Sequence, residues 1–238
     1  MIKVANLKKS FTGQAVLRDI SLNVAPGELI VILGESGSGK SVFLQHLIGL
    51  LKPDSGSIEI DGVDITTLSE RKLLKLRKNI GYLFQEGALY DFMTVYENIA
   101  FPLHEHTRLR LKEIKEKVLN ILKLVGLEKA GMKFPSELSG GMRKRAALAR
   151  SVVLDSKILF CDEPTSGLDP KKSKEISDLI NDISRRSKCT TVITSHDIYN
   201  SFRIADRLVL IDHGQIIARG KPEEIELSSD PKVKEFLI

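Results

Sequence analysis

A glycine-rich octapeptide that ends in lysine and serine is the first segment whose residue types could do chemistry. The sequence GESGSGKS at 34–41 fits the phosphate-binding pattern G-x-x-x-x-G-K-[ST] at every fixed position. Backbone amides of such a loop surround phosphate oxygens where side chains would clash, while Lys40 supplies a point charge and the Ser41 hydroxyl suits Mg²⁺. A glycine-rich turn without function is the alternative. We expect nucleotide binding by Gly34, Glu35, Ser36, Gly37, Ser38, Gly39, Lys40 and Ser41.

Two adjacent carboxylates, Asp162 and Glu163, follow the apolar run at 158–161. That run is typical of a buried strand, so the pair should lie at its carboxyl end, where ligands bind in open α/β sheets. We predict that Asp162 holds Mg²⁺, directly or through water. Glu163 is then the candidate general base that polarises an attacking water. A helix cap is the alternative, because Pro164 and Thr165 come next.

Ser139, Gly140 and Gly141 precede the segment MRKRAALARSVV, which contains strong helix formers. Free amides at a helix N-terminus form an anion site, although in isolation such a segment is usually only a loop. Gln85 and His196 each follow a strand-like run. A lone histidine after a strand is more often structural, and we give that interpretation to His46, His104, His106 and His213.

Taken in this order, the motifs resemble the ATP-binding cassette of ABC transporters. The resemblance implies that Ser139, Gly140 and Gly141 reach the γ-phosphate held by the opposite subunit. One such segment per chain then implies a homodimer that sandwiches two ATP molecules with their Mg²⁺. Met142 stands where glutamine is common in the family, a departure that leaves the serine and both glycines intact.

The same resemblance assigns roles to four other residues. Gln85 would contact Mg²⁺ and the attacking water, and His196 would contact the γ-phosphate. Asp169 would communicate across the dimer. Phe11 would stack on adenine, and an ordinary core phenylalanine is the alternative reading of that residue.

The elements that position these residues alternate between strand and helix, which implies a parallel sheet covered on both faces. Strands are expected at Ile2–Leu7, Ser21–Val24, Leu29–Leu33, Ser57–Ile60, Ile80–Phe84, Ile158–Cys161, Thr191–Thr194 and Leu208–Asp212, and helices at Ser38–Leu51, Lys172–Arg186 and Ile198–Ala205. Helical spacing prevails from 88 to 153, with an apolar stripe at Ile114, Val118, Ile121, Leu122 and Val125, and Gly126 as a helix stop.

We therefore expect an α/β fold. Its P-loop ATPase core has a mostly parallel sheet flanked by helices, a small antiparallel β region, and an inserted α-helical subdomain. Residues 1–238 form a single nucleotide-binding domain, in which 1–87 and 154–238 make the α/β core. The helical subdomain with the Ser-Gly-Gly motif covers 88–153.

Composition narrows the class of protein. The 238 residues are 42% hydrophobic and 28% charged, which is ordinary for a soluble globular chain. No apolar run approaches the roughly 20 residues of a membrane span, and the N-terminus is not a secretory signal. Cys161 and Cys189 lie too far apart in sequence to indicate a zinc site or disulfide framework, so a reducing cytoplasm is expected.

The net charge of +5 admits partners such as nucleic acid or an anionic membrane surface. Its densest basic run, RKLLKLRK at 71–78, has no interleaved aromatic residues for base stacking. We interpret the run as a surface helix and expect no nucleic-acid partner.

The stretch GYLFQEGALYDFMTVYENIAFPLHEHTRL at 81–109 resembles the ATPases of Mla/Mce-type lipid transporters. This implies phospholipid transport, with the chain located at the cytoplasmic face of the inner or plasma membrane and peripheral to it through a permease. The partners would be an MlaE-like integral-membrane permease docked beside Gln85 and an MCE-domain substrate-binding protein. Amino-acid or other small-solute import is the main alternative. Soluble ABC-type ATPases acting on DNA, ribosomes or iron–sulfur assembly are a further one, although a long coiled-coil insertion and a second cassette are both absent from this sequence.

Overall fold

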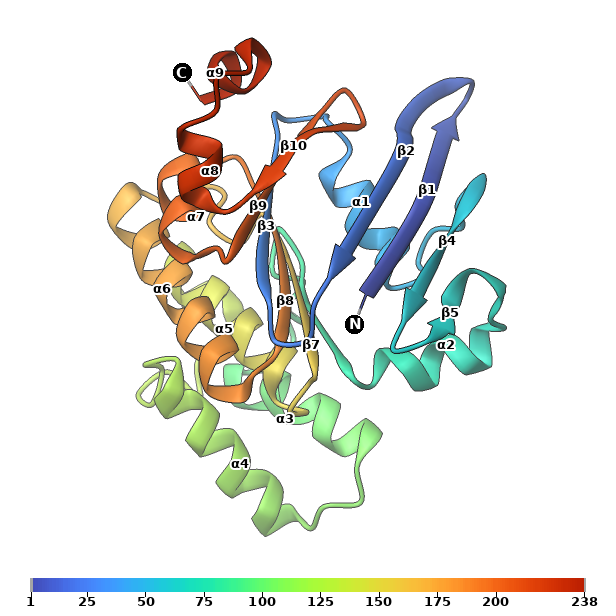
Figure 1. The fold of residues 1–238 in the computed structure, drawn as a ribbon. Coiled ribbons are helices and arrows are strands. Elements are labelled where there is room, and N and C mark those ends of the chain that lie inside the picture. The colour runs from blue at the N-terminus through green and yellow to red at the C-terminus, as the bar shows by residue number, and fades with distance from the viewer. Residues whose placement is uncertain (1, 238) are drawn as a thin grey trace.

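Two β-sheets and a group of helices make up the computed structural model, which describes residues 2–237. The larger sheet has six strands in the order β10-β9-β3-β8-β7-β6, and only β10 runs antiparallel to its neighbour. Its strands are β3 (Leu29–Leu33), β6 (Ile80–Leu83), β7 (Ile158–Asp162), β8 (Thr190–Ser195), β9 (Arg207–Asp212) and β10 (Gln215–Gly220). The predicted fold class, a mostly parallel sheet flanked by helices with a small antiparallel region, is confirmed (Figure 1).

The strand β3 shows why this sheet is buried on both faces. All five of its residues are fully buried. Successive side chains point to opposite faces of the sheet. Ile30 and Ile32 pack in the core that contains Phe43 of α1 (Lys40–Leu47), whereas Val31 packs in the core that contains Ile176 of α6 (Pro170–Ser187). A continuous apolar strand is the pattern expected when helices cover both faces of a parallel sheet.

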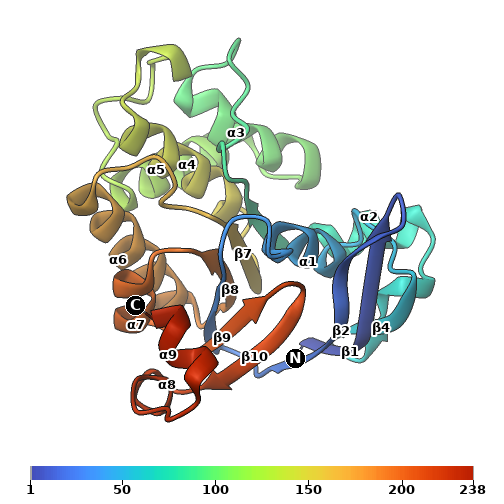
Figure 2. The same cartoon turned by 90° about the horizontal axis from the view of Figure 1, so that it is seen from above.

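The smaller sheet is antiparallel, with the order β2-β1-β4-β5. Its strands are β1 (Ile2–Phe11), β2 (Gln14–Val24), β4 (Ser55–Ile60) and β5 (Val63–Asp64). The apolar side chains of β1, β2 and β4 share one core with α1 (Lys40–Leu47) and alternate residues of the large sheet. Seen from above, α1 lies between the two sheets (Figure 2).

Helices occupy the chain between β6 and β7. They are α3 (Val95–His106), α4 (Leu111–Leu124) and α5 (Gly140–Val152), with a short 3₁₀ turn at Pro135–Glu137. They have a hydrophobic core of their own, to which the predicted stripe contributes Ile114, Val118, Leu122 and Val125, while Ile121 is half-buried. Gly126, at φ +70°, follows α4 as expected of a helix stop. Helices α3 and α4 form the lower part of the molecule in Figure 1, and α5 lies between them and the large sheet.

The remaining helices are α2 (Glu70–Arg77), α6 (Pro170–Ser187), α7 (Ile198–Ile204), α8 (Pro222–Glu226) and α9 (Pro231–Leu237). The basic run at 71–78 is the predicted surface helix, and of the residues in α2 only Leu73 is buried. Within residues 2–237, no helix combines the length and apolar character needed to cross a bilayer.

Several predicted boundaries were wrong. The helix expected from Ser38 to Leu51 begins at Lys40 and ends at Leu47, because Gly39 and Gly49 both adopt left-handed backbone angles. The first two strands extend beyond the predicted limits, to Phe11 and from Gln14, since cross-strand pairing compensates for their polar residues. Strand β10 and helices α8 and α9 were not predicted.

Candidate active site

A cavity of about 660 Å³ lies beside the glycine-rich loop, at the edge where the parallel strands end. We call it the phosphate-loop cavity. The loop follows β3, and Gln85, Glu163 and His196 follow the ends of β6, β7 and β8. Carboxyl ends of parallel strands meet at one edge of a sheet, which brings these distant residues together. The cavity is lined by Val16, Glu35, Ser36, Gly37, Gly39, Lys40, Ser41, Val42, Gln85, Glu163 and His196.

The backbone of the loop requires glycine at specific points. A Cβ atom at Gly34 would lie 2.4 Å from Ser38 Oγ and 2.6 Å from the carbonyl oxygen of Ile211. Gly39 has φ +100°, a conformation that other residues rarely adopt. The buried hydroxyl of Ser38 has no hydrogen-bond partner among residues 2–237. The first amides of α1 have no intrahelical acceptor, so the loop offers several donors to a phosphate.

Lys40 lies at the base of the cavity, with only 5% of its surface exposed. Its Nζ atom donates to the main-chain oxygens of Gly34 at 2.7 Å and Glu35 at 2.9 Å. The same ammonium forms an ion pair with Glu163, at 3.1 Å from Oε1. A buried cation at the start of a helix is a site where a phosphate can bind.

Both carboxylate oxygens of Glu163 have partners. Oε2 lies 2.8 Å from His196 Nδ1, and the His196 side chain itself is largely exposed. The backbone of Glu163 is left-handed, at φ +44°, and its amide donates to the carbonyl of Thr194 at 3.1 Å. A non-glycine residue in this conformation is uncommon outside functional sites and turns. The structure thus joins Lys40, Glu163 and His196 into one chain of contacts.

Ser41 and Asp162 form the other part of the site. The Ser41 hydroxyl donates to Asp162 Oδ1 at 2.8 Å, and the Thr194 hydroxyl donates to the same oxygen at 2.7 Å. These hard oxygen atoms fit Mg²⁺, which usually takes one or two protein ligands and completes its shell with phosphate and water. Among residues 2–237, no group of three or more His, Cys, Asp or Glu side chains is arranged to hold a metal ion.

Thr194 was missed by sequence reasoning. It is fully buried, and its hydroxyl contacts Asp162 while lying 3.1 Å from the amide of Glu163. The available signal was a threonine two residues before His196, at the end of a strand-like run. Such a residue needs a hydrogen-bond partner, and a threonine on the strand next to β7 could have been paired with the carboxylates.

The Ser-Gly-Gly segment lies apart from the phosphate-loop cavity. Ser139 is the N-cap of α5, and its hydroxyl accepts a bond from the amide of Met142 at 3.4 Å. Gly140 lines a different cavity of about 520 Å³, together with Gln85, Lys144 and residues 166–168. Of the residues in this segment, none lines the phosphate-loop cavity of its own chain.

Asp169 caps α6 by accepting a bond from the amide of Lys172 at 3.0 Å. Its bonds to Lys172 hold the pKa of the Asp169 carboxyl below its usual range. Phe11 ends β1 with 40% of its surface exposed, and Lys9 Nζ lies 5.3 Å from its ring centre. Phe11 is therefore not a core residue, although it does not line the phosphate-loop cavity either.

The other histidines lie outside the site. His46 is buried, and its Nδ1 atom lies 2.7 Å from the carbonyl of Val42, as expected of a structural residue. On the surface lie His104, His106 and His213.

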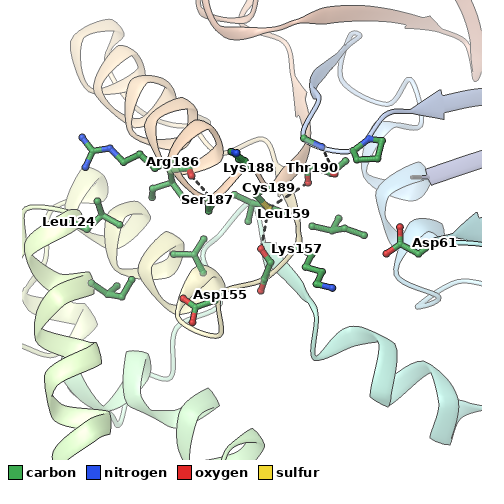
Figure 3. Close-up of a pocket in the computed structure, with 17 residues that line it drawn as sticks. Asp61, Leu124, Asp155, Lys157, Leu159, Arg186, Ser187, Lys188, Cys189 and Thr190 are labelled. Carbon is green, nitrogen blue, oxygen red and sulfur yellow. Dashed lines mark hydrogen bonds between the residues drawn. The ribbon is translucent and has the colours of Figure 1, made fainter.

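A third cavity, of about 410 Å³, opens at the opposite edge of the large sheet (Figure 3). Lys157 and Thr190, from the starts of β7 and β8, lie in its wall beside Cys189. The Cys189 thiol contacts the carbonyl of Ser156 at 3.3 Å, and burial raises its pKa to about 11. A thiol with that pKa is a poor nucleophile at neutral pH. This cavity contains none of the predicted site residues.

Several known proteins are similar to this chain over most of its length. The ABC transporter family profile matches residues 17–166. The probable ribonucleotide transport ATP-binding protein mkl of Mycobacterium leprae is 45% identical over 99% of this chain and 68% of its own length. The mkl protein of Mycobacterium bovis is 46% identical over 99% of this chain, which spans 66% of the length of that protein.

Two other groups of relatives are similar over the whole chain. The methionine import ATP-binding protein MetN of Campylobacter jejuni is 40% identical over 100% of this chain and 75% of its own length. The intermembrane phospholipid transport system ATP-binding protein MlaF of Haemophilus influenzae is 40% identical over 100% of this chain and 90% of its own. A dimeric post-hydrolysis state of the ATP-binding cassette MJ0796, bound to ADP and phosphate, superposes with a TM-score of 0.87. Its sequence identity is 31%, with coverage of 93% of this chain and 99% of that one.

Proposed function

This chain belongs to the ABC transporter family as an ATP-hydrolysing subunit, and from that premise we propose which residues perform the hydrolysis and which cargo it drives. The observation that carries the residue assignment is the contact chain Lys40–Glu163–His196 inside the phosphate-loop cavity. The donor-rich loop 34–41 would bind the phosphates of ATP, with Lys40 placed against the β- and γ-phosphates. Phe11 would stack on the adenine.

Hydrolysis in this proposal depends on positioning and charge, since phosphoryl transfer requires little covalent chemistry from the protein. Glu163 orients and deprotonates the attacking water, and His196 contacts the γ-phosphate and holds Glu163. Ser41, Asp162 and Gln85 would hold Mg²⁺, which neutralises phosphate charge when bound.

The second half of each site would come from another copy of the chain. Ser139, Gly140 and Gly141 stand at the N-terminus of a 13-residue helix but lie outside the phosphate-loop cavity of their own chain. A helix start of this kind favours an anion. We propose a homodimer in which these residues reach the γ-phosphate bound by the partner, with Asp169 communicating between the two sites.

The chain organisation follows from these roles. We propose one nucleotide-binding domain over 1–238, with an α/β core at 1–87 and 154–238 and a helical subdomain at 88–153. The subdomain has a hydrophobic core of its own, while Ala147 and Leu148 of α5 join it to the core of the large sheet.

For the cargo, we favour phospholipid. The support is the resemblance of residues 81–109 to Mla/Mce-type ATPases, together with the similarity to MlaF along the full chain. MetN is equally identical, so amino-acid import, or import of another small solute, is the second candidate. A soluble, non-transport ABC ATPase is the least favoured.

The permease surface would lie next to Gln85. Phe84, the preceding residue, exposes 38% of its surface, and Tyr90 and Phe92, whose ring centres lie 5.7 Å apart, expose 39% and 76%. Exposed aromatic residues in a group are typical of protein contacts. We propose that an MlaE-like permease docks on this surface, that an MCE-domain protein completes the complex, and that the chain is peripheral to the cytoplasmic face of the inner or plasma membrane. We propose no nucleic-acid partner for the chain.

The test is affinity purification of the tagged chain from detergent-solubilised native membranes, with mass spectrometry of the proteins and lipids that remain bound. A multi-span permease, an MCE-domain protein and phospholipid would support the lipid assignment. A permease with a soluble solute-binding protein would replace it by small-solute import. Absence of any membrane partner would contradict both assignments and favour a soluble ATPase.

A further inference from the structure

A second buried lysine, Lys144, lies outside the roles assigned above. It belongs to α5, one turn after the glycines that begin that helix, and only 8% of its surface is exposed. Its ammonium donates to the main-chain oxygen of Gln85 and to the Ser166 hydroxyl at 3.2 Å. A lysine is almost never fully buried unless its ammonium has partners. The two hydrogen bonds provide those partners, and the position of Lys144 between them calls for a functional explanation.

The three segments that meet at Lys144 each carry a proposed functional motif. Helix α5 begins with the Ser-Gly-Gly segment. Gln85 is the residue proposed to contact Mg²⁺. Ser166 lies between the carboxylate pair and Asp169, in the loop that leads to α6. One side chain therefore connects the partner-facing half-site to both loops that border the phosphate-loop cavity.

Lys144 lies near several carboxylates but forms no ion pair with them. Glu86, Asp162 and Glu163 all attract the ammonium, yet burial outweighs them and lowers the pKa of Lys144. Among residues 2–237, no carboxylate lies within 4.0 Å of its Nζ atom. A hydrogen bond from a charged donor in such a setting is roughly twice as strong as a neutral one. The main-chain oxygen of Gln85 is thus held by a strong donor that moves with α5.

We propose that Lys144 is a positioning residue that couples the Ser-Gly-Gly helix to the Gln85 loop, so that Gln85 takes its hydrolytic position only when α5 is correctly placed. The inference rests on the proposed roles of Gln85 and Ser139. Any rotation of α5 shifts the Lys144 ammonium, and the Gln85 carbonyl must follow or lose its donor. The contact with Ser166 transmits the same shift toward Asp169.

The experiment compares Lys144→Met, Lys144→Arg and the control Lys123→Met, which removes an exposed lysine from the end of α4. ATP affinity is measured by calorimetry, and the ATPase rate is measured against Mg²⁺ concentration. In Lys144→Met we expect ATP affinity within about twofold of the parent and kcat about 10-fold lower, the loss expected for one charged hydrogen bond. The Mg²⁺ concentration for half-maximal rate should rise, because Gln85 is misplaced, and Lys144→Arg should restore most of kcat.

Thermal unfolding of each variant identifies a folding failure. If Lys144→Met does not fold, Lys144→Gln and Ser166→Ala replace it, and both should lower kcat with ATP affinity retained. An unchanged kcat and Mg²⁺ response in a folded Lys144→Met protein would overturn the proposal, and so would a loss confined to ATP affinity. Failure of the proposed site itself would be recognised separately, as normal ATPase activity in Glu163→Gln.

Discussion

The Lys40 ammonium lies 3.1 Å from Oε1 of Glu163, and both side chains are almost excluded from solvent. The residue proposed to hold the γ-phosphate and the residue proposed to activate water therefore neutralise each other. A γ-phosphate at Lys40 would compete with Glu163 for the same ammonium. Binding of ATP and release of the general base are thus linked by one contact.

Replacing Lys40 should affect both binding and stability. Lys40→Ala leaves the Glu163 carboxylate buried with only His196 as a partner, and breaking a buried pair in this way costs about 3–5 kcal/mol. We expect a lower Tm, ATP binding weakened at least about 10-fold, and loss of turnover. Calorimetric titration and thermal unfolding measure these effects. The double variant Lys40→Ala/Glu163→Gln should recover part of the Tm, and a double variant no more stable than Lys40→Ala would contradict the coupling.

Glu163→Gln should separate binding from turnover. The amide keeps nearly the same shape and can still contact Lys40, but it does not take a proton from water. We expect ATP affinity to be retained and kcat to fall at least about 100-fold. An ATP-stabilised dimer should then be visible by light scattering. Undiminished ATPase activity would refute the role of Glu163 as the general base.

The hydroxyl of Thr194 should be needed to hold the carboxylates. Thr194→Val removes the bond to Asp162 Oδ1 while preserving shape, leaving that oxygen with one donor fewer. We expect a weaker Mg²⁺ response and a kcat reduced about 10-fold, since one lost bond to a charged group costs about 1.5–3 kcal/mol. ATPase assays over a range of Mg²⁺ concentrations would measure this.

The same strand provides the control. Thr191 is equally buried, but its hydroxyl contacts Ser184 at 2.8 Å and lies away from the carboxylates. Thr191→Val should lower stability without changing the Mg²⁺ response. Equal effects of the two substitutions on kcat would show that strand β8 matters only for folding.

Mixing two inactive variants should restore activity if the sites are shared between subunits. Lys40→Ala inactivates the phosphate-loop half, and Ser139→Glu places a negative charge where the partner's γ-phosphate would lie. A mixed dimer keeps one intact site, so random assortment should recover about a quarter of the wild-type rate. ATPase assays on an equimolar mixture test this, with each variant alone as the control. A mixture that is no more active than the two variants measured alone would contradict the composite site.

The stability of the chain should fall in mild acid through His46. Burial lowers the pKa of His46 below its usual value of 6.5, so the unfolded chain binds a proton more readily than the folded one. This contribution to stability is complete above pH 6.5 and is lost as pH falls from 6.5 toward the folded pKa. The limiting slope is about 1.4 kcal/mol per pH unit.

Urea unfolding between pH 7.5 and 5 measures that slope. His46→Gln should reduce it, whereas His213→Gln should not, since the His213 side chain is 87% exposed. An unchanged slope in His46→Gln would assign the acid sensitivity to other groups.

The sequence by itself determined which chemistry the chain could perform and at which element each group lies. Phosphate binding follows from the local pattern at 34–41, because a tight glycine loop before a helix creates its donors without distant partners. The positions of Asp162 and His196 were also predictable from local patterns, because each lies at or just after the end of a strand-like run of a parallel sheet.

Only the tertiary structure decided which of these groups touch. Ser41 and Asp162 are bonded across 121 residues of sequence, and Lys144 and Gln85 across 59. Such contacts depend on strand order and helix packing, which a single sequence does not encode in any local pattern. The roles of the buried Thr194 hydroxyl and of the Lys144 ammonium depend on the neighbours that folding places beside them. A polar group inside a core needs hydrogen-bond partners, and those partners come from distant parts of the sequence.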